Sequence, residues 1–353
     1  MTEITAVSTR LITRPLSRPW GADVRDLHFI AVDVTDSSGA TGHGFSWTPT
    51  IGPRAVQSLT DHEITAFAVG KPADASELWR PLWEHLHEAG SGGITTIAMA
   101  GLDLALWDLA ARRADTSVGR LLGEKRTSVG TYGSGVNLHY SLEQLVDQVE
   151  RWVTAGHTAV KIKVGKPDLA EDLERIGAVR EVLGPDRRLM VDANQRWDLD
   201  RARAAATAFQ DFDIAWLEEP LRADDLAGHV ALRQSTDIPI ALGENLHTEY
   251  RFRDFLDAGA VDIVQPNIVR VGGITPFMSI ARLADERGAA LYPHLLPDLS
   301  GQLALCLERP TMVEDVEDAG FGQIGALDSP SPVVIDGTTL TVTEHLGLGL
   351  TFA

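Results

Sequence analysis

The chain is poor in cysteine, in basic charge and in long apolar runs, and each shortage excludes a class of protein. A single cysteine, Cys306, rules out an intrachain disulfide and suits a reducing compartment. With 31 basic and 50 acidic residues, the formal net charge is −19, which disfavours nucleic acids and anionic membranes as partners. The first twenty residues hold no sustained apolar segment, so we expect no signal peptide or membrane span, and a cytoplasmic location.

Lysine is scarce as well, yet two of the five lysines stand almost side by side. They are Lys161 and Lys163, inside the apolar, β-branched run AVKIKVG at 159–165. Such a run predicts a buried strand, in which residues two apart point to the same side. Burying two ammonium groups together is costly, so this placement indicates an anionic counterpart close by.

The first part of the chain predicts an α+β domain. The runs HFIAVDV (28–34) and TGHGFSW (41–47) flank the turn-rich TDSSGA, which is typical of a β-hairpin. Two helical stretches follow, at 75–90 and 95–114. We expect this capping domain to occupy residues 1–125.

After residue 125, short strand-like runs alternate with amphipathic helical runs. The predicted strands lie at 129–135, 159–165, 188–194, 214–220, 238–244, 260–267, 290–295 and 311–316. Eight strands separated by helices indicate a parallel sheet, most economically a closed, TIM-like (β/α)7β barrel over 126–325. An open doubly wound sheet is the alternative. The tail, 326–353, holds two strand-like runs joined at Asp-Gly, and we expect it to return to the cap.

Polar residues recur at the predicted strand ends, where barrel enzymes place their function. After Lys163 they are Asp192, Glu218, Glu244, Asn267, His294 and Glu314, at intervals of 29, 26, 26, 23, 27 and 20 residues. Any one of these carboxylates could merely cap the next helix. As a series they would repel one another unless a cation joined them, and oxygen-only ligands suit Mg²⁺ rather than zinc.

The arrangement resembles the enolase superfamily, and within it the mandelate racemase subgroup. The matching motifs are the K-x-K of VKIKVG, the Asp of VDANQ, the first Glu of LEEP, the Glu of LGEN, the segment QPN…VGG and the His of YPHL. The resemblance extends over nearly the whole chain. The runs KIKVGKP, LMVDANQ and VGGITPF are similar to acid-sugar dehydratases of the L-talarate/galactarate type.

The resemblance implies a reaction and a set of roles. Removal of the proton α to a carboxylate would give an enediolate, and the expected net reaction is dehydration of an aldonate or aldarate to a 2-keto-3-deoxy acid. The implied metal ligands for Mg²⁺ are Asp192, Glu218 and Glu244. Lys163 would be the base, and Lys161 and Glu314 would act at the substrate carboxylate.

One position departs from the family pattern. The histidine of this subgroup usually pairs with an aspartate on the preceding strand, and here that position is Asn267. Asparagine cannot stabilise an imidazolium by charge, so we expect one-sided chemistry in which Lys163 removes the proton and His294 assists the leaving hydroxyl. A racemase, epimerase or cycloisomerase on the same scaffold is the alternative, and a non-catalytic homologue is a lesser one.

Substrate selectivity is expected at the cap. The segments 14–22 and 46–52 are predicted to be loops over the barrel mouth, with Arg18, Trp20 and Trp47 as candidate contacts. An arginine would suit the second carboxylate of a diacid. Asn194 is interpreted as either a turn former or a ligand contact. The expected partners are a small carboxylate substrate and further copies of the chain, as a homo-oligomer from dimer to octamer.

Overall fold

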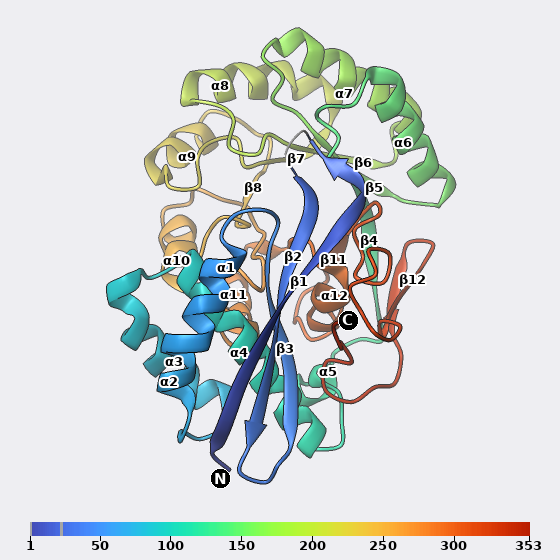
Figure 1. The fold of residues 1–353 in the computed structure, drawn as a ribbon. Coiled ribbons are helices and arrows are strands. Elements are labelled where there is room, and N and C mark those ends of the chain that lie inside the picture. Colours follow the sequence, from blue (N-terminus) through green and yellow to red (C-terminus); the bar gives the residue numbers. More distant parts are fainter. Residues whose placement is uncertain (1, 22–23) are drawn as a thin grey trace.

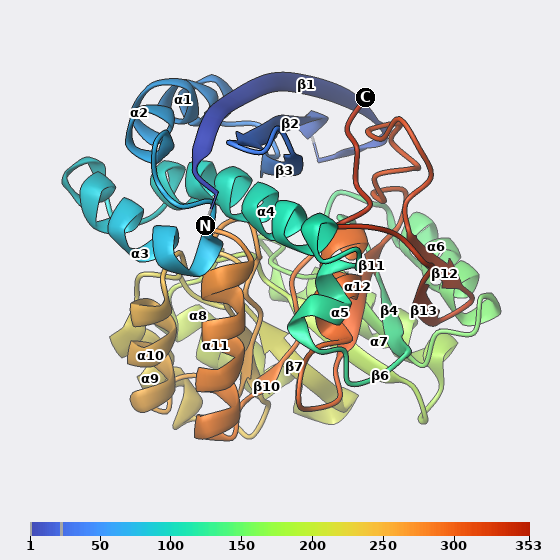
Figure 2. The ribbon, with the colours of Figure 1, turned by 90° about the horizontal axis from the view of Figure 1, so that it is seen from below.

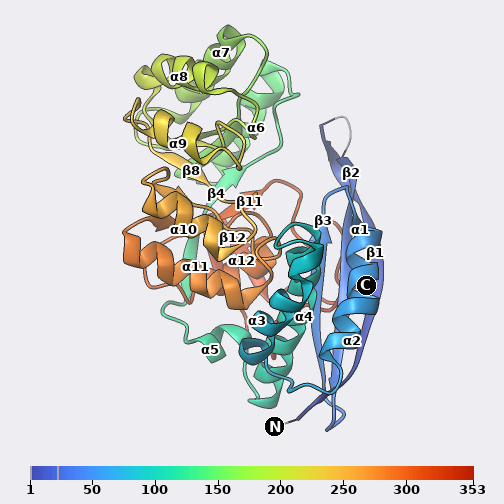
Figure 3. The same cartoon turned by 90° about the vertical axis from the view of Figure 1, so that its left-hand side faces the viewer.

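The computed structural model describes residues 2–21 and 24–353 and consists of a cap and a barrel side by side (Figure 1, Figure 3). The cap begins with three strands and continues with helices. Its elements are β1 (Ile4–Trp20), β2 (Val24–Asp36), β3 (Thr41–Thr48), α1 (Pro53–Leu59), a π-helical turn (Thr60–Ile64), α2 (Thr65–Ala68), α3 (Ala75–Leu86) with a 3-10 turn (His87–Ala89), and α4 (Ile94–Arg113).

The cap sheet is antiparallel in the order β1-β2-β3, and it contains the predicted hairpin between β2 and β3. The prediction of a loop from residue 14 was wrong, because β1 continues to Trp20, which pairs with Val24. Prolines 15 and 19 suggested a loop, but β1 is an edge strand, where a missing backbone donor leaves no central ladder broken. Residue 22 of that segment lies outside the described residues.

Helix α4 is the core of the cap and packs across its sheet (Figure 2). Gly42 and Gly44 of β3 lie directly against the α4 backbone, so a Cβ atom at either position would collide with it. The helix is long and apolar enough to cross a membrane, but 78% of that stretch is buried within the protein, which is typical of a core helix.

The predicted barrel is confirmed, and the open-sheet alternative is wrong. Its strands are β4 (Ser128–Ser134), β5 (Ala159–Lys163), β6 (Arg188–Asp192), β7 (Ile214–Glu218), β8 (Ile240–Leu242), β9 (Ile263–Val264), β10 (Ala290–Leu291) and β11 (Met312–Val316). They run parallel in chain order, and β11 pairs with β4. The Thr311 hydroxyl, which donates to the Leu291 carbonyl over 2.6 Å, brings β11 beside β10 and closes the ring.

Helices fill the intervals between strands and cover the outside of the barrel. They are α6 (Leu142–Thr154), α7 (Leu169–Leu183), α8 (Leu199–Ala208), α9 (Leu226–Arg233), α10 (Glu249–Asp257), α11 (Ile274–Arg287) and α12 (Pro297–Ala304). A short helix, α5 (Val118–Leu122), links the cap to β4. The carboxyl ends of the strands face the cap, which therefore lies over the mouth of the barrel.

The tail behaves differently from the expectation that all of it returns to the cap. Strands β12 (Val333–Asp336) and β13 (Thr339–Val342) form the hairpin at Asp-Gly, but β13 pairs with β4 and extends the barrel sheet. Only the residues after it reach the cap, where Phe352 packs against Phe45 with ring centroids 4.8 Å apart. Strand β5 pairs with β4 at Gly133 and Ser134, so β13 can pair with residues 128–130, an arrangement that the local sequence pattern does not reveal.

The cap also forms hydrogen bonds with the loop between β9 and α11 and with the first turn of α11. Asp103 of α4 accepts from the Thr275 backbone N–H over 3.1 Å and so caps α11, whose own N-cap residue is Gly273. The indole N–H groups of Trp107 and Trp79 donate to Thr275 Oγ1 and to the Gly272 carbonyl, over 2.9 and 2.8 Å. This loop contains Asn267, which bonds His294, so the cap holds a segment that reaches the barrel mouth.

Asp103 makes the stability of the fold depend on pH. Burial raises the pKa of its carboxyl from 3.8 to about 7, against hydrogen bonds from Thr275 and Ile274 that lower it. The folded state therefore holds a proton that the unfolded chain releases, and this stabilisation is full below about pH 4 and lost as the pH rises through about 7.

We predict that the unfolding free energy of the native protein, relative to Asp103→Asn, increases as the pH falls from 7 to 4. The increase should approach about 1.4 kcal/mol per pH unit, because the asparagine does not titrate. Urea unfolding at several pH values measures it. A difference that stays constant over this range would contradict the assignment.

Candidate active site

The two lysines of the K-x-K motif lie at the carboxyl end of β5, inside the barrel mouth. Lys161 is fully buried, and its Nζ lies 2.7 Å from Glu218 Oε1 and 2.8 Å from Glu314 Oε1. Lys163 is nearly buried and forms an ion pair with Asp192. Each ammonium group is thus paired with carboxylates, which explains how two of them are tolerated on one strand face.

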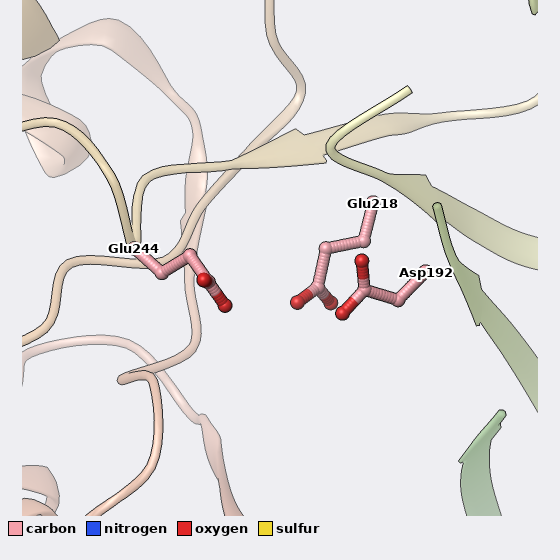
Figure 4. A group of neighbouring side chains, drawn as sticks. All are labelled: Asp192, Glu218 and Glu244. Carbon is pink, nitrogen blue, oxygen red and sulfur yellow. The ribbon is translucent and has the colours of Figure 1, made fainter. Parts of the chain in front are cut away.

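Three carboxylates converge on one space at the ends of neighbouring strands (Figure 4). Asp192 ends β6, Glu218 ends β7, and Glu244 follows β8; each offers an oxygen within 4.8 Å of the others. The sequence predicted this trio as metal ligands, and the fold brings it together. Register makes this possible, because Lys163 pairs with Asp192 and Asp192 with Glu218 across adjacent strands.

Supporting side chains hold these carboxylates in place. The Asn194 backbone N–H donates to Asp192 Oδ1 over 2.8 Å. Glu218 Oε2 accepts from Trp216 Nε1 and Gln265 Nε2, at 3.1 and 2.8 Å. These bonds orient the outer oxygens and leave the carboxylates facing one another.

The electrostatics show more negative charge than the lysines neutralise. Burial, and then the neighbouring Asp192, raise the pKa of Glu218 to about 7. Burial and Glu244 also raise the pKa of Glu219, which the sequence analysis did not place at the site. Burial acts to raise the pKa of Glu314 too, but Lys161, His294 and Lys163 together outweigh it and bring the value down to about 2.

This donor set fits Mg²⁺. All three converging groups supply oxygen, the ligand atom that Mg²⁺ prefers, and their mutual repulsion is relieved by a divalent cation. Asp192, Glu218 and Glu244 would hold the ion. Burial acts to lower the pKa of Lys163, but Asp192, Glu244 and Glu218 together outweigh it and raise the pKa.

The pair Asn267 and His294 lies on the other side of the carboxylates, with His294 Nε2 at 2.7 Å from Glu244 Oε2. The Asn267 Oδ1 accepts from the backbone N–H groups of Val269 and Arg270, over 3.1 and 3.0 Å. Its Nδ2 therefore faces His294 Nδ1, at 3.1 Å, and an amide nitrogen only donates. This network assigns the histidine proton to Nε2, the nitrogen that points at the site.

Five residues without a glycine's freedom adopt positive φ angles around this mouth. They are Asn194, Gln195, Glu219, Leu295 and Leu296, with φ between 40° and 61°. Such backbone is costly and gathers where function requires it. At Leu295 it turns the N–H toward Glu314 Oε2, 3.0 Å away, and so helps to fix that carboxylate.

A cavity of about 200 Å³ lies between the carboxylates and the cap. Of the predicted contacts, Asn194, Trp20 and Trp47 line it. Asn194 also adopts a left-handed backbone conformation, as a turn former would, and its contact with a ligand stays a prediction. Arg18 is not among the residues described as lining the cavity; it donates to the Tyr140 hydroxyl over 2.9 Å.

Sequence reasoning missed Arg270 and Gln265. Arg270 donates to the Glu244 carbonyl over 3.1 Å and to Asn245 Oδ1 over 2.6 Å, and its guanidinium lies 3.6 Å from Glu244 Oε1. Both residues belong to the segment QPNIVRVGG, which was recognised as a motif without roles for its members. Their spacing from the strand end was the available signal.

Two family models match the chain and together cover most of it. Residues 1–123 match the model described as mandelate racemase / muconate lactonizing enzyme, N-terminal domain. Residues 144–353 match the model described as enolase C-terminal domain-like. The agreement therefore includes the cap as well as the barrel.

Among characterised relatives, the chain is 37% identical over 324 residues to 3,6-anhydro-alpha-L-galactonate cycloisomerase of Streptomyces coelicolor, covering 92% of this chain and 89% of that protein. It is 35% identical over 331 residues to L-talarate/galactarate dehydratase of Salmonella typhimurium, covering 93% and 81%. One relative is an isomerase and the other a lyase, and both act on acid sugars.

Solved structures agree in fold and in metal. A racemase from Streptomyces coelicolor with bound magnesium superposes with a TM-score of 0.92 at 34% identity, covering 99% of this chain and 97% of that one. L-Talarate dehydratase from Polaromonas, complexed with Mg and L-glucarate, gives a TM-score of 0.89 at 34% identity, covering 100% and 96%. Magnesium is thus present in close structural neighbours.

We predict that Mg²⁺ binds at the three carboxylates and is required for turnover. EDTA should abolish activity, and Mg²⁺ or Mn²⁺ should restore it. Glu244→Gln should weaken Mg²⁺ binding at least tenfold, roughly the effect of losing even a supporting group, as measured by calorimetry. The exposed control Glu181→Gln on α7 should bind as the native protein does. Full activity after metal removal would refute the site.

Proposed function

This chain belongs to the mandelate racemase / muconate lactonizing enzyme family of the enolase superfamily, and we propose that it removes the proton α to the carboxylate of an acid sugar and eliminates the oxygen at C3. The product would be a 2-keto-3-deoxy acid. The observation that carries the proposal is the placement of a lysine amine and a histidine N–H on opposite sides of the carboxylates.

The substrate carboxylate would be bound at the inner end of the cavity. Bound Mg²⁺ would supply positive charge there and would weaken the hold of the carboxylates on the lysine protons. Lys161, buried between Glu218 and Glu314, presents its ammonium group at this end and stabilises the charge that collects on the carboxylate oxygens.

Lys163 is the proposed base. Its Nζ takes the proton from C2 once its pairing with Asp192 is relieved, because only the neutral amine has a free electron pair. Arginine could not replace it, since a guanidinium stays protonated. The electrons of the C2–H bond pass to the carboxylate and give the enediolate.

His294 is the proposed acid. As the electrons return, a C2–C3 double bond forms, the C3–O bond breaks, and the leaving oxygen takes the Nε2 proton. The ring regains a proton from water, so His294 ends the cycle as the neutral imidazole. When that oxygen is a hydroxyl, water departs and the reaction is a dehydration. When it belongs to a ring, the ring opens without loss of atoms, which is a cycloisomerisation. The resulting enol then becomes the ketone.

The assigned histidine proton argues against the alternatives of racemisation and epimerisation. Those reactions need a base on each face of C2, and a histidine with its proton on Nε2 is the wrong tautomer to be one. The ordered hydrogen bonds of Asn267 also argue against a degenerate site. Dehydration stays the first proposal. Cycloisomerisation is the second, and it is supported by the similarity to a cycloisomerase that is 37% identical.

Location and assembly stay predictions. A cytoplasmic location agrees with the single, buried Cys306, the pKa of whose thiol is raised by burial to about 12, so that it resists oxidation. A homo-oligomer is expected as before.

We predict that Lys163→Ala abolishes both turnover and exchange of the C2 proton with D₂O, each by about 1,000-fold or more. His294→Asn should abolish turnover but leave exchange, because the lysine still forms the enediolate. Proton NMR follows both. Lys166→Ala is the matched control. Lys166 pairs with Glu171 on α7, so its loss should change neither turnover nor exchange. Exchange that survives in Lys163→Ala but not in His294→Asn would make the histidine the base.

We also predict that Asn267→Asp changes the type of reaction. A carboxylate would accept from His294 Nδ1–H and leave Nε2 unprotonated, which makes the histidine a base. Elimination should fall about tenfold or more, and C2 should gain deuterium from both faces, visible as epimerised substrate. Unchanged elimination without epimerisation would show that Asn267 does not set the tautomer.

A further inference from the structure

The basic side chains that line the cavity all lie at its inner end. Lys163 pairs with Asp192, His294 lies against Glu244, and Arg270 binds Glu244 and Asn245. Each is therefore a neighbour of the proposed metal ligands. A ligand held there by one carboxylate would extend away from all three positive groups.

The opposite wall is apolar. Its residues are Trp20, Val24, Trp47 and Pro49 from the cap, and Val136 and Val316 from the barrel. The two valines follow or end β4 and β11, which lie across the ring from β8 and β7 and so from the carboxylates of those strands. Among the described lining residues, this wall has no basic side chain; residues 22 and 23 are alanine and aspartate, so neither adds one.

Arg18 was the candidate ligand for a second carboxylate, but its guanidinium is bound elsewhere. Nη1 donates to the Tyr140 hydroxyl over 2.9 Å and lies 3.4 Å from Glu317, and the group stacks over the Tyr140 ring. Glu317 is itself held by Arg151, at 2.9 Å. Withdrawing Arg18 toward the cavity would break this network.

The wall contains one neutral polar group. The indole N–H of Trp47 has no acceptor in the described part of the chain, and the side chain is 2% exposed. A buried donor without a partner is costly, but this nitrogen has almost no accessible surface and so is not presented to the cavity. A carboxylate placed on this wall would gain no donor from this indole and would lose its hydration.

We infer, building on the proposed function, that the substrate is a monocarboxylate with an uncharged far end. The apolar wall of Trp20, Val24, Trp47 and Pro49 determines this selectivity by excluding a second carboxylate. The enzyme is thus specific for aldonates or their cyclic ethers, and it discriminates against aldarates of the same stereochemistry.

The test compares matched pairs of acids that differ only at the terminal carbon, a hydroxymethyl group in one and a carboxylate in the other. Exchange of the C2 proton with D₂O and turnover are measured on the Mg²⁺-loaded enzyme for each stereochemical pair. Every active pair should favour the monoacid by about 100-fold or more in kcat/KM. A diacid that matches or exceeds its monoacid overturns the inference and leaves the proposed function standing.

A variant locates the selectivity on the wall. Val24→Arg adds a guanidinium there and should shift the ratio of monoacid to diacid kcat/KM at least tenfold toward the diacid. The matched control Val334→Arg, on the half-exposed β12, should leave the ratio unchanged. An unchanged ratio in folded Val24→Arg overturns the assignment to this wall. Absence of exchange with every acid refutes the proposed function itself, a result that the wild-type measurement identifies separately.

Discussion

The repulsion among buried carboxylates at the barrel mouth is the constraint on which the rest of the site depends. Five of them share this space: Asp192, Glu218, Glu219, Glu244 and Glu314. Two lysines on one strand offset part of the charge, but burial and then the repulsion from Asp192 still raise the pKa of Glu218 to about 7. The excess negative charge thus favours a bound cation at the point where the proposed enediolate would collect negative charge. The same cation would therefore stabilise both the carboxylates and the proposed intermediate.

Much of this could be predicted from the sequence, because the signals are periodic. Eight strand-like runs repeat at nearly constant intervals, and polar residues recur at the strand ends with similar spacing. In a parallel barrel those ends must meet, so Lys163, Asp192, Glu218 and Glu244 were placed together without coordinates. Periodicity specifies which residues share an edge.

What failed was decided by non-local partners. Strand β1 tolerates its prolines only because it is an edge strand, and the tail hairpin joins β4 because that strand has room for a neighbour. Arg18 was predicted to bind the second carboxylate of a diacid. Its guanidinium instead binds Tyr140 and Glu317, which lie more than a hundred residues away in the sequence. The tautomer of His294 could not be predicted from the sequence either. It follows from two backbone N–H groups that donate to Asn267 Oδ1 and so turn the amide nitrogen toward the histidine.

The hydrogen bonds between the cap and the segment 267–275 have a consequence for any exchange of caps between related proteins. The cap lines one wall of the cavity and is also bonded, through Asp103, Trp79 and Trp107, to the segment that contains Asn267, the hydrogen-bond partner of His294. The lining of the cavity and the position of Asn267 therefore depend on the same domain. A cap transplanted from a relative would change the lining of the cavity and, unless it reproduced those three side chains, would remove the hydrogen bonds that hold the segment of Asn267, so the two domains would have to be exchanged together.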